Sequence, residues 1–186
     1  MDAAPPTMAL PDFPSAGPFR ATPPLLAGHG MRLRHARHAD LPWLCDLYAS
    51  TRVEEMAGVP WPETAKQAFL ADQFRLQHRH YVTHYADADF LVIEGEVGPV
   101  GRCYLQRGAP NHLLVDISLW PRQRGQGIGT QLISAAQQDA HTLGRGIHLH
   151  VLLQNVAARR LYERLGFVVI ATQGYHHHMR WPATAT

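Results

Sequence analysis

Apolar and polar positions begin to alternate with regular periods at Met31, where short strand-like runs start to alternate with longer helical stretches. Asp40 is a suitable N-cap for a helix that runs to about Ser50, with its leucines on or near one face. A second helical stretch begins at Glu63 or Thr64, after a proline break. The sequence therefore predicts two helices ahead of the main sheet.

Strand periods dominate the middle of the chain. Residues 89–94 and 99–105 flank a glycine-containing turn, which predicts an antiparallel hairpin. The segment 112–120 alternates more strictly, which predicts a strand with two distinct faces. One face carries Leu113, Val115, Ile117 and Leu119, and the other carries His112, Asp116 and Ser118.

Three glycines follow that strand, at the point where a helical pattern begins near Ile128 and runs to a stop at Gly144. A chain without β-carbons can wrap closely around a ligand and point consecutive N–H groups at it, and the helix dipole attracts an anion. The segment predicts a phosphate-binding loop, with Arg122 and Arg124 adding positive charge.

Glycines at such a turn also occur in nucleotide P-loops, in dinucleotide sites and in plain tight turns. A nucleotide P-loop needs Gly-Lys-Ser or Gly-Lys-Thr, but Gly129 is followed by Thr130 and Gln131. A dinucleotide site needs G-x-G-x-x-G and an acid at the end of the next strand, and both are missing. A tight turn that only allows close helix packing stays open for the loop taken alone.

A second motif follows the strand at residues 147–151. Its helix starts near Asn155 and ends at Gly166. Asn155 and Tyr162 are seven residues apart, two helical turns, so they point the same way. Such a polar pair on a mostly buried helix needs partners.

The R-x-x-G-x-G-I-G loop and the N-x-x-A-x-x-L-Y-x-x-x-G-F helix together resemble the GNAT superfamily of acetyl-CoA-dependent N-acetyltransferases. The resemblance reaches from about Met31 to Trp181. It implies that the strand ending at Leu119 splays from its neighbour near Val151, so that acetyl-CoA enters the gap. The residues that it assigns to acetyl-CoA are Ile117, Ser118, Leu119, Arg122, Arg124, Gly125, Gln126, Gly127, Ile128, Gly129, Thr130, Asn155 and Tyr162.

The same resemblance implies that Tyr162 donates to the departing CoA sulfur. A base must also take the proton of the incoming amine. Asp116 is the first candidate, directly or through water, and His150 is the second, because imidazole suits proton transfer at neutral pH. A solvated or hydrogen-bonded strand residue is the alternative for each.

Thirteen histidines invite a metal interpretation. His148 and His150 share one strand face, and His176 and His178 share another, but no carboxylate or thiolate joins either pair in sequence. We therefore expect no metal site. The two cysteines, Cys45 and Cys103, lie far apart and indicate neither a disulfide framework nor a zinc site.

Composition sets the remaining limits. The formal net charge of +2 comes from scattered arginines and one lysine, which does not favour nucleic-acid binding. No apolar run reaches the ~20 residues of a membrane span, and no signal peptide is evident, so we expect a cytoplasmic protein. Half of the 14 prolines precede Gly28. Residues 1–30 are therefore predicted to form an extended or disordered arm, 31–182 a single domain that could begin at Met31, and 183–186 a tail.

The predicted fold is a mixed, mostly antiparallel α/β sheet with helices on both faces. The predicted activity is transfer of the acetyl group of acetyl-CoA to a primary amine by direct attack. An O-acetyl or longer-chain acyl transferase and a non-catalytic acyl-CoA-binding module are the alternatives, and a homodimer is left open. The pool of acceptor-contacting residues comprises Trp43, Tyr48, Arg52, Glu54, Glu55, Trp61, Tyr81, Tyr85, Tyr175 and His176.

Overall fold

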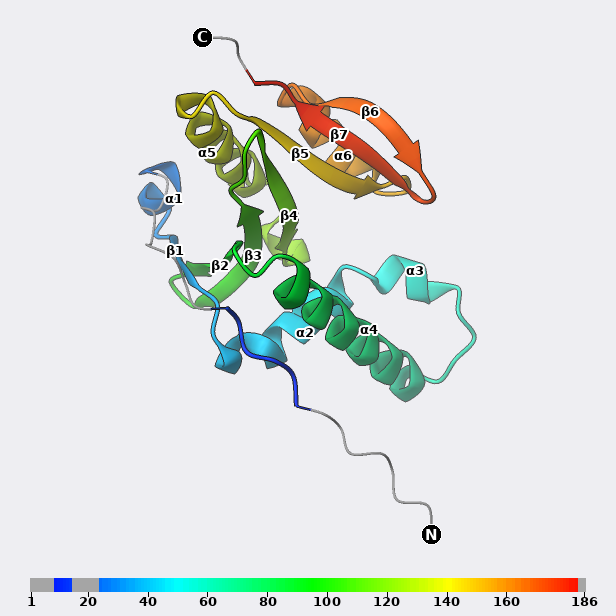
Figure 1. Cartoon of the computed structure of the whole chain (residues 1–186). Helices are drawn as coiled ribbons and strands as arrows, with labels where there is room; N and C mark the ends of the chain where they lie inside the picture. Colours follow the sequence, from blue (N-terminus) through cyan, green and yellow to red (C-terminus); the bar gives the residue numbers. More distant parts are fainter. Residues whose placement is uncertain (1–8, 15–23, 184–186) are drawn as a thin grey trace. The chain divides into compact units, whose positions relative to one another are not determined.

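The computed structural model describes residues 9–14 and 24–183 (Figure 1). The predictions for residues 1–8, 15–23 and 184–186 fall outside the described residues. The chain divides into a helical unit, Met1–Ser15 with Arg37–Ala86, and a sheet unit, Ala16–Ala36 with Asp87–Thr186. Each unit is built around its own set of buried side chains.

The helical unit contains the 3-10 helix η1 (His38–Asp40) and the helices α2 (Leu41–Ser50), α3 (Val53–Ala57) and α4 (Glu63–His84). Both predicted helices are confirmed. Tyr48 on α2 packs against Phe74 on α4, with ring centroids 6.1 Å apart. Among the described residues, no helix combines the length and apolar character that a membrane span requires.

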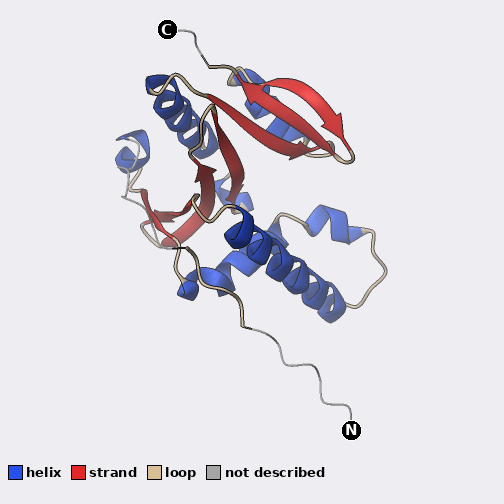
Figure 2. Cartoon of the chain, in the orientation of Figure 1, coloured by secondary structure: helices blue, strands red, loops and turns tan. Residues whose placement is uncertain are grey.

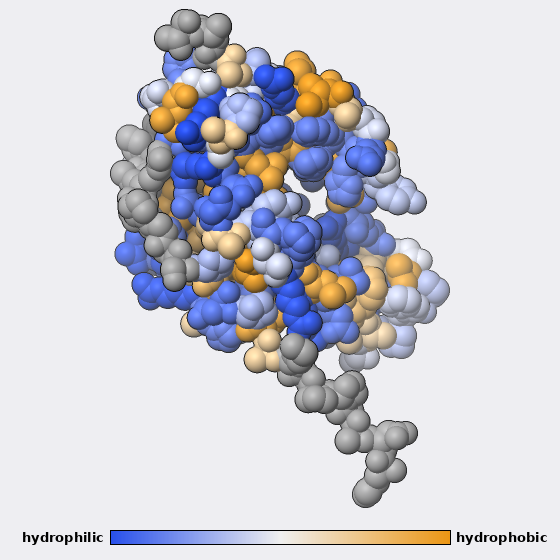
Figure 3. All heavy atoms as spheres, viewed as in Figure 1, coloured by the Kyte–Doolittle hydropathy of each residue, from blue (hydrophilic) through white to orange (hydrophobic). Residues whose placement is uncertain are grey.

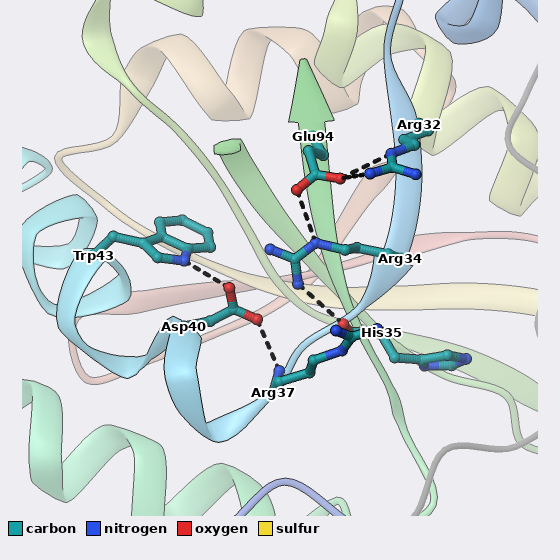
Figure 4. A network of polar contacts seen from close by, with 7 residues as sticks. All are labelled: Arg32, Arg34, His35, Arg37, Asp40, Trp43 and Glu94. Carbon is teal, nitrogen blue, oxygen red and sulfur yellow. Dashed lines mark hydrogen bonds and ion pairs between the residues drawn. The ribbon is translucent and has the colours of Figure 1, made fainter. Parts of the chain in front are cut away.

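Asp40 stabilises the start of α2 differently from a simple side-chain cap. Its carboxylate accepts the backbone N–H of Arg37 at 2.8 Å and the indole N–H of Trp43 at 2.9 Å (Figure 4). These bonds satisfy a side chain that is only 5% exposed. Asp40 thereby fixes the turn that leads into the helix.

The sheet unit holds one seven-stranded sheet in the order β1-β2-β3-β4-β5-β7-β6 (Figure 2). The pair β4–β5 is parallel and the other five pairs are antiparallel, which confirms the predicted fold class. Its elements are α1 (Pro24–Gly28), β1 (Arg32–His35), β2 (Asp89–Gly95), β3 (Gly98–Gln106), β4 (Asn111–Leu119), η2 (Pro121–Gln123), α5 (Ile128–Thr142), β5 (Gly146–Leu152), α6 (Val156–Arg164), β6 (Val168–Gln173) and β7 (His176–Trp181).

One face of the sheet carries the main hydrophobic core. Leu149 of β5 and its register partner Met179 of β7 are buried there with Leu132 of α5 and Phe167, which follows α6. The same face therefore holds both helices that follow the two sequence motifs. The opposite face of β5 and β7 is polar, since its positions alternate with those of the core.

The predicted faces of β4 are wrong in part, because a β-bulge interrupts the strand. Tyr104 of β3 pairs with Asp116 and Leu105 pairs with Leu114, so Val115 is an extra residue. His112 and Leu114 consequently face the core before the bulge, whereas Ile117 and Leu119 face it afterwards. A strict period of two could not reveal this shift.

His112 is thus fully buried instead of lying on the polar face. Its Nδ1 lies 3.2 Å from the Gly108 carbonyl oxygen, and its Nε2 lies 3.4 Å from Asp139 of α5. Arg107 pairs with both Asp139 and Asp89 of β2. This ionic cluster connects α5 with the loop between β3 and β4. Burial lowers the pKa of His112, so the ring is neutral at neutral pH.

At one edge of the sheet, side chains of β1 and β2 form ion pairs. Glu94 on β2 accepts hydrogen bonds from Arg32 and Arg34 on β1 (Figure 4).

At the other end of the sheet, Val168, Val169 and Ile170 of the edge strand β6 are 57%, 39% and 49% exposed. Hydrophobic surface is visible over this strand at the upper right of Figure 3. The β6 edge is therefore apolar as well as unpaired by any described strand.

The predicted arm is not extended throughout. Residues 24–28 form α1, and Leu26 is 1% exposed within the main core of the sheet unit. In the helical unit, the Pro11 carbonyl oxygen lies 2.7 Å from Nε2 of His78, and Phe13 packs edge-on against the same ring. A domain that begins at Met31 would lose both anchors.

Leu26→Ala is expected to lower the free energy of unfolding by about 2–5 kcal/mol, because it leaves a cavity in the core. A chain starting at Met31 should lose at least as much. Chemical denaturation measures both, with the exposed residue changed in His29→Ala as the control. Wild-type stability in the shortened chain would mean that the domain does begin at Met31.

Candidate functional site

A gap opens in the sheet where β4 and β5 separate. The two strands pair only from Asn111 with Gly146 to Leu114 with Leu149. Beyond the bulge at Val115, β4 continues to Leu119 and β5 continues to Leu152 without pairing to each other. This is the splay that the family resemblance implied. Backbone groups along the open edge of β4 can therefore bind an extended ligand.

After the bulge, the backbone of β4 lies very close to that of β3 at Gly101. A β-carbon at Gly101 would lie 2.4 Å from the Ser118 carbonyl oxygen and 2.6 Å from Leu119. No side chain fits there, so glycine is required for β4 to keep its path beside β3. Sequence reasoning missed this position, which stands out only as a glycine inside a strand pattern.

The glycine loop, residues 122–130, lies between β4 and the start of α5. Gly125 and Gly127 have φ angles of +75° and +80°, which non-glycine residues rarely adopt. In the part of the chain that the structure describes, the backbone N–H groups from Gly125 to Thr130 donate to no carbonyl group. The first turn of α5 also carries no acidic side chain. These six donors form an array suited to an anion.

Two arginines flank this N–H array. The Nε of Arg124 donates to the Leu119 carbonyl oxygen at 3.1 Å, which ties the loop to the end of β4. Arg122 lines an open groove of about 380 Å³ together with Trp120 and Pro121. Since both guanidinium groups are exposed, they are available to phosphate oxygens.

Asn155 and Tyr162 occupy opposite ends of α6. Asn155 is the N-cap, and its side-chain oxygen accepts the Ala158 N–H at 3.2 Å. Tyr162 is 7% exposed and packs against Phe167. Burial, with further contributions from Asp116 and Cys103, raises the pKa of the Tyr162 phenol above its usual value. The phenol therefore keeps its proton at neutral pH.

Asp116 is not a free carboxylate. Arg102 binds it through two hydrogen bonds, Nε to Oδ1 at 3.1 Å and Nη2 to Oδ2 at 2.9 Å. The Ser118 hydroxyl also donates to Oδ1 at 2.8 Å. Both oxygens are thus engaged, and Arg102 is only 3% exposed. Arg102 was missed from the sequence, although an arginine inside the apolar run of β3 is a signal for a buried partner.

His148 and His150 of β5 share the polar face of the sheet with His178 of β7. We call these three residues the histidine ladder. Nδ1 of His148 lies 3.2 Å from Nε2 of His178, and the rings of His150 and His178 stack with centroids 4.6 Å apart. Asp116 lies on the same face of the sheet, across the gap between β4 and β5. Both predicted bases thus border one opening.

Metal ligation finds no support in the ladder. Among the described residues, no group of three histidine, cysteine or acidic side chains is arranged to hold a metal ion. The close ring stacking instead directs the imidazole faces toward each other.

The predicted acceptor pool is divided between the units. In the helical unit Tyr48 is buried, Arg52 binds Glu55 and lies over the Tyr48 ring, and Trp61 packs edge-on against Phe69. Tyr175 and His176 are exposed in the sheet unit. The pool thus contains one core residue and several accessible ones.

Asp116→Asn is expected to lower the free energy of unfolding by about 3 kcal/mol, because it leaves the buried Arg102 guanidinium without its counter-charge. Adding Arg102→Met should restore part of that loss. Denaturation of the exposed-pair variant Asp72→Asn provides the control, with an expected change of about 0–1 kcal/mol. An equal loss of unfolding free energy in Asp116→Asn and Asp72→Asn would show that the Arg102–Asp116 pair stabilises the fold no more than an exposed ion pair does.

Comparisons with known proteins agree with this geometry. Residues 86–169 match the family described as acetyltransferase (GNAT) domain, which spans the gap, the glycine loop and α6. An uncharacterised N-acetyltransferase of Bacillus subtilis, YycN, is 40% identical over 55 residues. That match covers 29% of this chain and 35% of the relative's length.

Solved structures extend the likeness over most of the chain. A PaiA N-acetyltransferase from Thermoplasma acidophilum, in complex with coenzyme A, has a TM-score of 0.64 at 20% identity, covering 82% of this chain and 98% of its own. A Corynebacterium glutamicum structure, described as histone acetyltransferase HPA2 and related acetyltransferase, has a TM-score of 0.61 at 22% identity, covering 84% and 98%. The domain match shows that residues 86–169 form an acetyltransferase (GNAT) domain, and the chain shares its fold with solved acetyltransferase structures.

Proposed function

We propose that the protein transfers the acetyl group of acetyl-CoA to a primary amine. The observation that carries this proposal is the N–H array of residues 125–130, placed directly beside the gap between β4 and β5. The array suits the pyrophosphate, and the gap suits the extended pantetheine arm. One ligand with both parts accounts for both features.

The residues around the gap fit this ligand. Gly125 to Thr130 would hold the pyrophosphate with Arg122 and Arg124, and backbone groups of residues 117–119 would hold the acetyl carbonyl. The carbonyl oxygen gains negative charge as an amine attacks, and one preorganised N–H donor can contribute about 2.7–4 kcal/mol at that moment. Asn155 uses its side-chain oxygen as a helix cap, which leaves its amide N–H₂ for a pantetheine carbonyl.

Tyr162 is suited to the leaving group. Because its raised pKa keeps the phenol neutral, the hydroxyl is available to donate a hydrogen bond to the departing thiolate. Full proton transfer to a thiolate of ordinary pKa ~8.5 is unfavourable from so weak an acid. We therefore assign Tyr162 the role of stabilising the thiolate, with the proton supplied from elsewhere.

The choice of base changes in favour of His150. Asp116 already accepts three hydrogen bonds and balances the charge of Arg102, so both of its oxygens are engaged with other side chains. His150 is exposed on the same face, and its pKa is lowered first by burial and then by other histidines of the described residues. Asp116 then keeps β3 and β4 in register beside the acetyl group.

Direct attack by the amine is the simplest route. Burial raises the pKa of the Cys103 thiol to about 12, so it is not a thiolate at neutral pH. The pKa of Cys45 is also raised by burial. Neither thiol is set up to carry the acetyl group, which disfavours a covalent intermediate.

The two alternatives differ from this proposal in measurable ways. An O-acetyl or longer-chain acyl transferase would respond to different donors and acceptors in a substrate panel. A non-catalytic acyl-CoA-binding module would bind acetyl-CoA without turnover. The paired base candidates and the buried phenol favour an enzyme, since binding alone requires neither.

Location and assembly stay predictions. A cytoplasmic location follows from sequence composition alone. The exposed apolar edge of β6 supports a homodimer, because a second β6 strand could pair along it.

Gly127→Glu is expected to weaken acetyl-CoA binding at least tenfold, since it adds a carboxylate to the proposed pyrophosphate site. Isothermal titration measures the affinity. Gly144→Glu is a matched control, because Gly144 also has a positive φ, +63°, and lies beyond the opposite end of α5. Equal loss in both variants, or no binding by the wild type, would contradict the assigned site.

Tyr162→Phe is expected to lower kcat by about 10²-fold with little change in acetyl-CoA affinity, because the hydroxyl acts on the departing sulfur. The assay is thiol release from acetyl-CoA with a panel of spermidine, lysine and tryptamine. An unchanged kcat would remove Tyr162 from the mechanism.

A further inference from the structure

The three rings of the histidine ladder contact one another, although a single histidine would be enough to act as a base. His150 and His178 are directly opposite one another on β5 and β7, and their rings are nearly parallel, 18° apart. His178 also stacks on His148, at 5.3 Å and 23°, and shares a hydrogen bond with it. One ring therefore contacts both others.

The hydrogen bond limits the protonation states of the pair. A neutral imidazole has one donor nitrogen and one acceptor nitrogen, so either His148 or His178 supplies the proton that lies between them. Protonating both rings would place two donors face to face and two positive charges at contact distance. The ladder therefore favours neutral rings next to His150.

The charged and titratable groups on this face strengthen the effect. β7 contributes His176 and Arg180, with Arg180 opposite His148. β4 contributes Asp116, whose charge is balanced by Arg102 of β3. Arg180 adds to the lowering of the His148 pKa that burial and His178 cause, whereas the Asp116 charge is balanced by Arg102. An additional proton on the ladder is correspondingly unfavourable.

We propose that His178 is the positioning residue of a three-histidine base, in which His150 accepts the proton of the incoming amine. This inference rests on the proposed acetyl transfer. His178 fixes the ring plane of His150 by stacking, and its hydrogen bond to His148 fixes its own orientation. His178 itself does not contact the acceptor.

Proton transfer to His150 precedes the attack on the thioester. The ammonium N–H bond breaks and its proton moves to a ring nitrogen of His150, while the electron pair stays on the amine nitrogen. That pair attacks the thioester carbon, and the C–S bonding pair leaves with sulfur as a thiolate next to Tyr162. The attacking nitrogen, positively charged after the attack, loses its second proton to water or to the thiolate as the amide forms. The imidazolium then returns its proton to solvent, to which His150 is exposed.

The direction of the pH effect follows from the pKa shifts. Burial first, and then His178, lowers the pKa of both His148 and His150. Removing His178 should therefore raise the pKa of His150, so that the base stays protonated to a higher pH. The acid limb of the kcat/KM profile should move to higher pH in His178→Phe. At about pH 6 the rate should fall roughly three- to tenfold, and it should recover above about pH 8.

Two measurements test this on the full chain. Histidine-ring NMR titration follows His148 and His150 without any substrate, and thiol release with the most active panel amine gives the pH–rate profile. His177→Phe is the matched control, because His177 lies next to His178 but on the other face of β7, with Thr172 and Arg159 as partners. Thermal unfolding verifies that both variants are folded.

The expected result is an upward shift of both the NMR titrations and the acid limb in His178→Phe, and neither shift in His177→Phe. Unmoved titrations, or moved titrations with an unmoved acid limb, would overturn the role of His178. Loss of activity that is independent of pH would do the same. Failure of the proposed function is recognised separately, by a wild-type protein that does not bind acetyl-CoA.

Discussion

The structure depends on a single constraint, the separation of β4 from β5 after four paired residues. The extra residue at Val115 changes which side chains face the core, and Gly101 allows β4 to stay close to β3 while it leaves β5. A ladder continued to Leu119 would have satisfied the backbone of β4 with the neighbouring strand. Ending it early leaves hydrogen-bonding groups for a ligand instead.

The two faces of the sheet differ in polarity, and the candidate catalytic side chains are distributed between them. Tyr162 belongs to the core face, where low polarity keeps its phenol protonated. The histidine ladder lies on the opposite face, where His150 can exchange protons with water. A donor for the thiolate and an acceptor for the ammonium proton need opposite properties. In the proposed mechanism, the two faces of one sheet would supply both properties.

Sequence reasoning succeeded where local chemistry determined the outcome. The glycine loop was identifiable because positive φ angles at Gly125 and Gly127 need glycine, and the α6 motif followed from helical spacing. It failed where a partner distant in the chain decided the result. The Val115 bulge depends on β3, the engagement of Asp116 depends on Arg102, and the burial of Leu26 depends on the core of the sheet unit. Of these contacts, only the one made by Arg102 has a local signal, a charged residue inside an apolar run.

The ion pair between Arg102 and Asp116 illustrates why residue type alone is a poor guide to a base. A carboxylate on the correct face of the correct strand met the sequence criterion, yet a buried guanidinium takes both of its oxygens. A histidine that burial and other histidines keep neutral meets the chemical criterion better. A general base has to be deprotonated, with a free lone pair, before the amine arrives. Its neighbours in the fold determine this more than its pKa in water does.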